Sequence, residues 1–271
     1  MATAHILYEN KVLENKITDL VNTKLEARSL MTMDYSLTTA AGLKKVVNKY
    51  TYTGKVEKLA KAAKNTTRGK VTFTPVEYTV NRYQQTYDYN DMDVMQDPMV
   101  VDVASAGAAT LMANQIKEEY FAELAKISNS HTYANGTNPN YDTIVDALAT
   151  LDQEVEDGMF ILMGNDMRAV IRKDADYKAS KQGEILYTGQ FGTICGLPCL
   201  FSKLVPAKTI YVTHRDAVHF LVKKEGTVEQ DRDIETKDNT VVYERHGLIA
   251  LVDETKSVKI TEAAASGGGG G

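Results

Sequence analysis

Two long segments of the chain carry apolar residues at helical spacing. Within residues 6–30 polar positions separate an apolar stripe made of Leu13, Ile17, Leu20, Val21 and Leu25. This pattern predicts an amphipathic helix, either an extended N-terminal arm or an ordinary core helix. Asp97-Pro98 is a favourable helix start, and from it the pattern predicts a helix of about 30 residues that ends near Ile127 and forms the spine of the fold.

Residues 70–83 show a different period, because β-branched and aromatic residues alternate there with polar ones. This alternation is typical of a β-strand. Pro75 cannot donate a hydrogen bond to a neighbouring strand, and the phase of the alternation shifts at this position. We therefore expect an edge strand with a bulge at Pro75.

The second half of the chain mixes shorter helices and strands. Asn140 is expected to cap a helix that ends at Gly158, and Asn165 a short helix that reaches Ile171. The glycine-rich residues 183–198 are expected to form a loop. Strands are predicted at 159–163, 209–212, 217–222, 240–244 and 248–252. Because helices and strands do not alternate regularly, the expected fold class is α+β.

The composition, 43% hydrophobic and 25% charged over 271 residues, is that of a globular protein of one or two domains. A net charge of −5 argues against a main body that grips nucleic acid. No apolar run reaches the roughly 18 residues of a membrane span, so no membrane partner is expected. The N-terminus lacks the pattern of a secretory signal. Residues 263–271, which end in five glycines, are expected to be a linker tail.

Residues 44–70 depart from this acidic background. They hold nine basic residues and one acid, Glu57, whereas the rest of the chain holds 22 basic and 35 acidic residues. A hairpin here, with limbs of about a dozen residues, would reach roughly 40 Å and project beyond the body of the protein. Because an isolated hairpin is marginal in water, we expect it to rest on an acidic neighbour. The alternative is a disordered basic surface loop.

No motif in the sequence points to catalysis. It contains neither a phosphate-binding loop nor the turn that carries a hydrolase serine, and the five histidines are scattered. Cys195 and Cys199 lack the spacing of a redox or zinc pair and are expected to pack a loop. The acidic residues at 152–157 and 229–235 are expected to be solvated or to receive the basic segment. We therefore expect no enzyme activity, no cofactor and no metal.

The order of these parts, together with one phrase, resembles a known family. After the helical segment and the basic loop come the strand at 71–80, residues 87–93 and the long helix. Residues 189–202, Gly-Gln-Phe-Gly-Thr-Ile-Cys-Gly-Leu-Pro-Cys-Leu-Phe-Ser, are similar to a recurring family phrase, with Cys199 where valine is more usual. Residues 228–233 and 243–247 resemble its return strands. Over about 1–262 the chain resembles the major capsid protein of tailed bacteriophages, the Hong Kong 97 fold.

The resemblance implies a domain plan: an N-terminal arm (1–42), an extended E-loop (43–70), a peripheral domain (71–140) with its spine helix at 97–127, an axial domain (141–225), and return strands of the peripheral domain (226–262). It implies a virion protein that self-assembles into hexamers and pentamers of an icosahedral shell around double-stranded DNA, without sequence-specific binding. Its assembly would take place in the bacterial cytoplasm. The E-loop would lie on a neighbouring subunit, and the residues expected at this contact are Lys49, Lys55, Lys58, Lys61, Lys64 and Arg68.

A portal would be a further partner. Because the helical segment begins within about ten residues of Met1, scaffolding is expected to come from a separate protein or to be dispensable. Three alternatives remain open at this stage. They are an encapsulin-like nanocompartment shell with the same fold, a phage tail or adaptor protein that forms rings or tubes, and a soluble hydrolase.

Overall fold

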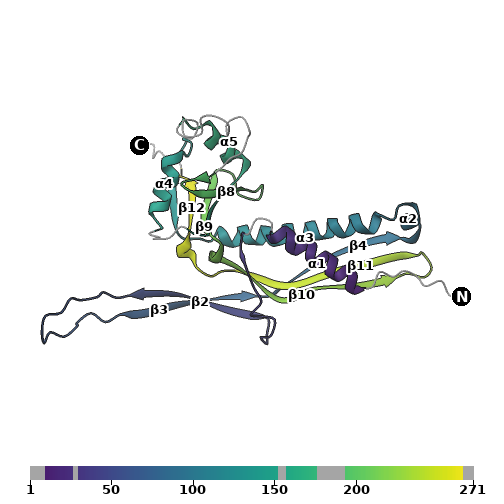
Figure 1. Cartoon of the computed structure of the whole chain (residues 1–271), viewed down its shortest axis with the longest axis horizontal. Coiled ribbons are helices and arrows are strands. Elements are labelled where there is room, and N and C mark those ends of the chain that lie inside the picture. The colour runs from purple at the N-terminus through teal and green to yellow at the C-terminus, as the bar shows by residue number, and fades with distance from the viewer. Residues whose placement is uncertain (1–9, 27–29, 152–156, 176–192, 265–271) are drawn as a thin grey trace, which may run out of the picture.

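The computed structural model describes residues 10–26, 30–151, 157–175 and 193–264. They form an elongated lobe, a compact lobe that stands on one end of it, and a two-stranded ribbon that extends away from both (Figure 1). Helices and strands are mixed along the chain, so the α+β fold class is confirmed.

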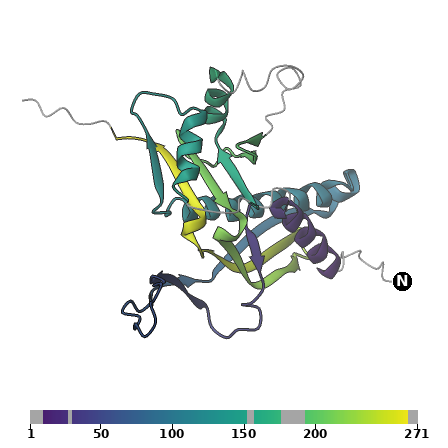
Figure 2. The same cartoon turned by 60° about the vertical axis from the view of Figure 1, so that its left-hand side comes forward.

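The elongated lobe is built on a four-stranded sheet in the order β1-β10-β11-β4. The strands are β1 (Thr32–Asp34), β10 (Val218–Arg232), β11 (Asp238–Leu251) and β4 (Asn81–Asn90). β1 pairs with β10 in parallel, and the other pairs are antiparallel. A register irregularity interrupts β10 between Val222 and Thr227. α1 (Asn10–Glu26) and α3 (Val100–Leu124) pack on this sheet (Figure 2).

β11 is one continuous strand, although the sequence predicted two strands separated at residues 245–247. Arg245 does not interrupt it, because this side chain is fully buried and its Nη1 donates a hydrogen bond of 2.8 Å to Asn22 Oδ1 on α1. Gly247 does not break it either. A Cβ atom at Gly247 would lie 2.8 Å from the ring of Phe220, so glycine is needed for close packing there.

The long helix is shorter than predicted and is preceded by a separate turn of helix. α2 spans Asp91–Gln96, and Asp97 is its C-terminal capping residue. α3 begins at Val100 and ends at Leu124. The Asp97 carboxylate accepts a hydrogen bond of 2.9 Å from the Met99 N–H and thereby shapes the junction. Asp97 therefore joins two helices and is not the first cap of one long helix. At 25 residues, α3 is about 37 Å long.

The compact lobe holds a six-stranded sheet in the order β5-β12-β9-β6-β8-β7. α4 (Tyr141–Ala149) and α5 (Asn165–Lys173) also belong to this lobe (Figure 1). β12 pairs with β5 and β9, so it lies in this sheet and not with the return strands among which the sequence placed it. The strand bounds are β5 (Ser130–Tyr133), β6 (Met159–Met163), β7 (Thr193–Ile194), β8 (Leu197–Phe201), β9 (Thr209–His214) and β12 (Ser257–Glu262).

Helix capping in this lobe is confirmed at one position and corrected at another. Asn140 caps α4, and its side chain and that of Thr143 exchange hydrogen bonds with each other's backbone N–H groups. Asn165, in contrast, is the first residue of α5, and Gly164 occupies the capping position. The expected loop at 183–198 proves to include the hairpin of β7 and β8, while its first ten residues lie outside the described part. Two short 3-10 turns, Arg215–Ala217 and Glu254–Lys256, complete the chain.

Candidate assembly surface

The basic segment forms the projecting ribbon. β2 (Lys44–Thr53) pairs with β3 (Lys70–Thr79) over ten antiparallel residue pairs, from Lys44 opposite Thr79 to Thr53 opposite Lys70. The ladder is about 33 Å long. The register runs without a shift past Pro75, which faces Asn48, so the expected bulge is absent from this ladder. A two-stranded ribbon leaves one edge of each strand free, and such an edge tolerates proline.

The base of the ribbon is fixed to its own subunit. On one face, Val47 and Tyr78 pack against a small core cluster made of Leu37, Leu221, Leu248 and Ala250. The Leu251 N–H donates a hydrogen bond of 3.3 Å to the Tyr78 hydroxyl, and burial raises the pKa of that hydroxyl. Lys49 Nζ lies 3.2 Å from Glu254 Oε2. These contacts set the direction in which the ribbon leaves the body.

The tip of the ribbon, residues 54–69, has an internal structure of its own. The Glu57 carboxylate accepts hydrogen bonds from the Thr66 N–H at 3.1 Å, the Thr66 hydroxyl at 3.0 Å and the Thr67 hydroxyl. Where the ladder ends, the Tyr52 ring lies against Gly69 so closely that a side chain at position 69 would collide with it. The two limbs of the tip are therefore held together.

Five of the six residues expected at a subunit contact lie on this tip. Lys55, Lys58, Lys61, Lys64 and Arg68 are all exposed. Among the residues that the structure describes, none of the five forms an ion pair within its own chain. Lys49 differs, because it lies at the base of the ribbon and pairs with Glu254. The contact role of all six residues stays a prediction.

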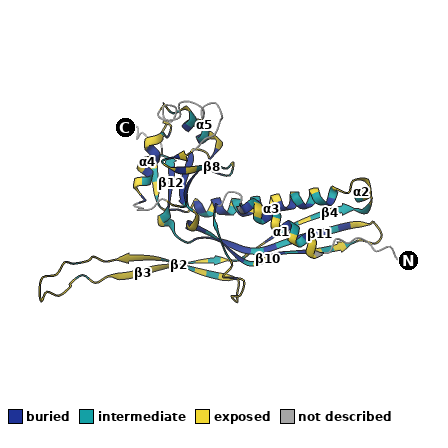
Figure 3. Cartoon of the chain, in the orientation of Figure 1, coloured by how far each residue is buried: buried dark blue, intermediate teal, exposed yellow. Residues whose placement is uncertain are grey.

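The ribbon also carries an apolar face that the charge pattern did not predict. Residues opposite each other in the ladder share a face, and every second residue along a strand returns to it. One face therefore collects five large side chains, each between 51% and 71% exposed, namely Val46, Tyr50, Tyr52, Val71 and Phe73. The Tyr50 and Phe73 rings lie 6.2 Å apart between centroids. Figure 3 shows the outer part of the ribbon as exposed, whereas the part of β2 next to the body is partly buried.

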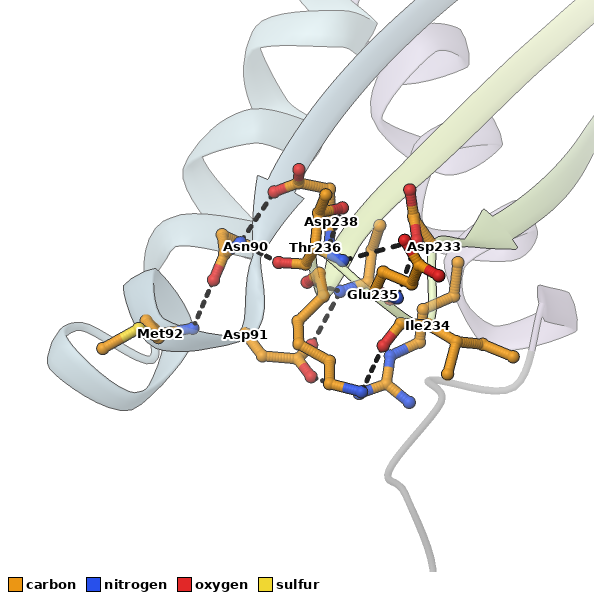
Figure 4. Close-up of polar contacts among 11 residues, drawn as sticks. Asn90, Asp91, Met92, Asp233, Ile234, Glu235, Thr236 and Asp238 are labelled. Atoms are coloured by element: carbon orange, nitrogen blue, oxygen red, sulfur yellow. Dashed lines mark hydrogen bonds and ion pairs between the residues drawn. The ribbon is translucent and has the colours of Figure 1, made fainter.

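The opposite end of the elongated lobe is acidic. There the β10–β11 turn meets α2, and Asp91 joins the two elements by an ion pair with Arg232 and by accepting a hydrogen bond of 2.7 Å from Asn239 (Figure 4). Asn90 donates a hydrogen bond of 2.7 Å to the Asp238 carboxylate. The exposed acidic side chains at this end include Asp93, Asp231, Asp233, Glu235 and Asp238. Basic and acidic groups thus lie at the two ends of the subunit (Figure 1).

The acidic residues near the turn serve structure. Asp233 accepts hydrogen bonds from the backbone N–H groups of Glu235 at 2.8 Å and Thr236 at 3.4 Å, which lower the pKa of its carboxyl group. These bonds shape the turn between two strands. Residues 152–156, which hold other candidate acids, lie outside the described residues.

Among the described residues, His214 and the two cysteines make structural contacts. His214 Nδ1 accepts a hydrogen bond of 3.0 Å from the Asp216 N–H, and its Nε2 lies 2.8 Å from the Asp157 carbonyl, so it joins two loops. Cys195 and Cys199 are partly buried against the core of the compact lobe, as expected. Within the described ranges, no cluster of three or more His, Cys, Asp or Glu side chains could hold a metal ion. No helix among these residues is long and apolar enough to cross a membrane.

A two-lobed subunit with a long helix on a sheet and a projecting ribbon has the Hong Kong 97 fold that the resemblance implied. Solved structures support this fold. The chain superposes on a protein of Mycobacterium phage Che8 with a TM-score of 0.65 and 17% identity, covering 85% of this chain and 89% of that one. A virus-like particle from Pyrococcus furiosus gives a TM-score of 0.61 at 11% identity, covering 94% and 100%.

Sequence comparisons identify the family. The profile of the family described as phage capsid protein matches residues 73–260, so the chain belongs to that family. It is also 30% identical over 90 residues to the major capsid protein of Staphylococcus phage phiMR11. This alignment spans only 33% of the chain and 33% of that relative. The protein is a phage capsid shell protein, and the resemblance noted in the sequence is confirmed.

Proposed function

We propose that this protein is a major capsid protein whose copies form the hexamers and pentamers of an icosahedral shell around double-stranded phage DNA. Its place is the virion, and its assembly takes place in the cytoplasm of the bacterial host. The family match and the curated relative support this role. A portal, and a separate scaffolding protein where one is needed, would complete the particle.

The apolar face of the ribbon, Val46, Tyr50, Tyr52, Val71 and Phe73, is the observation that carries the proposal. Apolar area removed from water stabilises a contact by about 25 cal/mol per Å². The described part of the chain leaves this face uncovered, whereas the base of the opposite face, at Val47 and Tyr78, packs on its own body. A contiguous exposed apolar surface marks an interaction site. We propose that a neighbouring copy of the same chain covers this apolar face.

The charges at the two ends of the subunit favour a head-to-tail contact between copies. The basic tip would approach the acidic turn at 231–235 of a neighbour, which accelerates encounter and excludes the reversed orientation. A contact between different surfaces of two copies closes into a ring when the rotation between them allows it. Rings of this kind are what hexamers and pentamers require.

The two lobes fit the plan that the resemblance implies, with adjusted limits. The elongated lobe, with α1, α3 and the four-stranded sheet, would be the peripheral domain. The compact lobe, with β5 and β12 in its sheet, would be the axial domain. The E-loop is the ribbon and its tip. α1 packs on the peripheral lobe. The N-terminal arm would therefore comprise only the residues before and after α1.

Charge reversal at the tip tests the contact. Lys55→Glu with Lys61→Glu, and the fourfold change that adds Lys58→Glu and Lys64→Glu, should leave the monomer folded but prevent shell assembly. Lys11→Glu with Lys173→Glu is a control of equal charge, since both lysines are exposed and lie on α1 and α5. Light scattering and negative-stain imaging measure the particles. Normal shells from the fourfold variant would contradict the role of the tip, and high salt should slow assembly of the unchanged protein.

A second candidate is a cellular protein shell that encloses other cargo. The sequence left this alternative open, and the fold shared with a virus-like particle from Pyrococcus furiosus is compatible with both candidates. The contents of purified shells distinguish the phage capsid from the cellular compartment. Double-stranded DNA inside them supports the phage capsid, whereas a protein cargo without DNA supports the compartment.

A further inference from the structure

A basic cleft lies where the compact lobe meets α3. It has a volume of about 480 Å³ and lies between α3, the start of α5 and the segment that follows β8. Figure 2 shows the compact lobe standing over this part of α3. The polar lining residues that matter are Asn114, Lys117, Asn165, Arg168 and Lys203. The ribbon and the acidic end take no part in it.

The charge of this cleft is of one sign. Lys117, Arg168 and Lys203 line it, and no acidic residue does. Within the described ranges, Arg168 and Lys203 form no ion pair. The nearest acid along the chain, Asp166, uses its carboxylate to accept a hydrogen bond of 2.8 Å from the Lys208 N–H. Lys117 Nζ donates a hydrogen bond of 2.7 Å to the Lys24 carbonyl on α1, so Arg168 and Lys203 are the two cations that an anion in the cleft would meet.

Arg168 is held in one orientation. Its guanidinium carbon lies 4.5 Å from the centroid of the Phe201 ring, so the group stacks on an aromatic face. The Nε atom of Arg168 is buried and has no hydrogen-bond partner among the described residues. A stacked guanidinium loses little freedom on binding, and its planar fork matches the oxygens of a phosphate group.

Two neutral groups add donors beside the cations. The Asn114 side chain lines the cleft from α3. Asn165 is the first residue of α5, and the capping residue Gly164 supplies no side-chain hydrogen bond to the N–H groups of the first turn. Such N–H groups favour a negative charge nearby. They support an assignment that rests on Arg168, fixed by its stacking on Phe201, and on Lys203.

We propose that this cleft binds a phosphate group, and that the group belongs to the backbone of nucleic acid. The assignment of the source rests on the proposed function, because a capsid protein meets nucleic acid at high concentration inside its shell. Arg168 holds two phosphate oxygens, and Lys203 supplies a second positive charge. The cleft reads no base, because a backbone contact carries no sequence information.

The test measures binding by the unassembled full-length protein. A fluorescent DNA duplex is titrated at several salt concentrations, and the slope of log affinity against log salt is compared between variants. Arg168→Gln with Lys203→Gln should weaken binding and reduce the magnitude of the slope by about 2, because each lost phosphate contact removes about one unit. Lys203→Gln alone, a change at an exposed side chain, should reduce it by about 1.

Lys11→Gln with Lys173→Gln is the matched control and should keep the slope of the unchanged protein. The cations of the ribbon contribute equally to every variant, so the difference isolates the cleft. Equal slopes in all variants, or an equal loss in the control, would overturn the proposal. Competition with inorganic phosphate distinguishes free phosphate from the nucleic-acid backbone as the ligand. If inorganic phosphate saturates the cleft while Arg168 and Lys203 make no difference to duplex affinity, the nucleic-acid assignment is overturned.

Light scattering on the same variants separates this proposal from the proposed function. If the cleft variants assemble poorly but bind the duplex like the unchanged protein, the cleft contacts a neighbouring subunit and the phosphate assignment is overturned. If the unchanged protein forms no shell, the proposed function fails, while the slope measurement on the unassembled protein still decides the phosphate site.

Discussion

Glu57 shows how one residue shapes the tip of the ribbon. It is the only acid in the basic segment 44–70, and no lysine of the tip lies within ion-pair distance of it in the described chain. Hydrogen bonds from Thr67 and Thr66 instead hold the pKa of its carboxyl group below the usual value of 4.5. The ionised carboxylate thus acts as a clasp between the two limbs. This clasp leaves the lysines free to face a partner.

The role of Glu57 as a clasp can be tested by substitution. Glu57→Ala should raise hydrogen exchange across residues 54–69, because Thr66 and Thr67 lose their acceptor. Glu77→Ala is the control, since Glu77 pairs with Lys44 at the other end of the ribbon. In the unchanged protein the lowered pKa means that the clasp is complete above about pH 4.5 and is lost as the pH falls through the pKa of the folded state. Unchanged exchange in Glu57→Ala would show that Tyr52 and Gly69 alone hold the tip.

Among the elements, α1 decides between two interpretations that the sequence left open. Its apolar stripe is buried, and the exposure of Ile17 and Val21 is 0%. Lys16 Nζ lies 2.5 Å from Asp102 on α3, and Asn22 accepts a hydrogen bond from the buried Arg245. α1 is therefore a core helix in this structure, not a free arm. The spacing of apolar residues predicted the helix, but it could not say which surface the stripe would meet.

A buried stripe has a measurable energetic effect. Ile17→Ala should lower the free energy of unfolding by about 2–5 kcal/mol, because it leaves a cavity between α1, α3 and the sheet. Val12→Ala, at a position that is 53% exposed on the same helix, should change it by less than about 0.5 kcal/mol. Denaturant titration of the unassembled protein measures both. Equal small effects would indicate that α1 detaches in solution.

Other elements show which features can be predicted from the local sequence and which depend on distant residues. The hydrophobic run at 159–163 was enough to predict β6, and Asn140 was enough to predict the start of α4. The continuity of β11 depends on Asn22 and Phe220, which lie far away in sequence, so its local pattern suggested two strands. β12 joins the compact lobe through pairing with β5 and β9, and such pairing is not encoded in the six residues of the strand itself.

Across the whole molecule, the charge contrast along the chain indicated either a projecting basic hairpin or a disordered basic loop, and the ribbon is the hairpin (Figure 1). The apolar face was hidden because it appears only when the register of the two strands is known. The basic cleft beside α3 was hidden for a similar reason, since Lys117, Arg168 and Lys203 come from separate segments. Surfaces that recognise a partner are assembled from distant residues, whereas helices and strands are largely local.

The apolar face allows a test that is independent of charge. Tyr50→Ser with Phe73→Ser should leave the unfolding free energy of the subunit nearly unchanged, because both side chains are more than 60% exposed and lie away from the core. Shell formation should fail, because the ribbon would lose the apolar area that a neighbour covers. Tyr50→Leu with Phe73→Leu keeps that area and should assemble. Light scattering during assembly measures all three proteins.

Thr51→Ser with Thr72→Ser is the matched control, since these residues face each other on the opposite side of the same ladder. The cross-strand aromatic pair contributes roughly 0.2–1 kcal/mol to the ribbon, so hydrogen exchange in β2 shows whether the ladder survives the serine changes. With the ladder intact, lost assembly in the serine variant and normal assembly in the leucine variant place the contact on the apolar face. Normal shells from the serine variant would mean that the basic tip alone carries the contact, and charge reversal at Lys55 and Lys61 would then be the more damaging change.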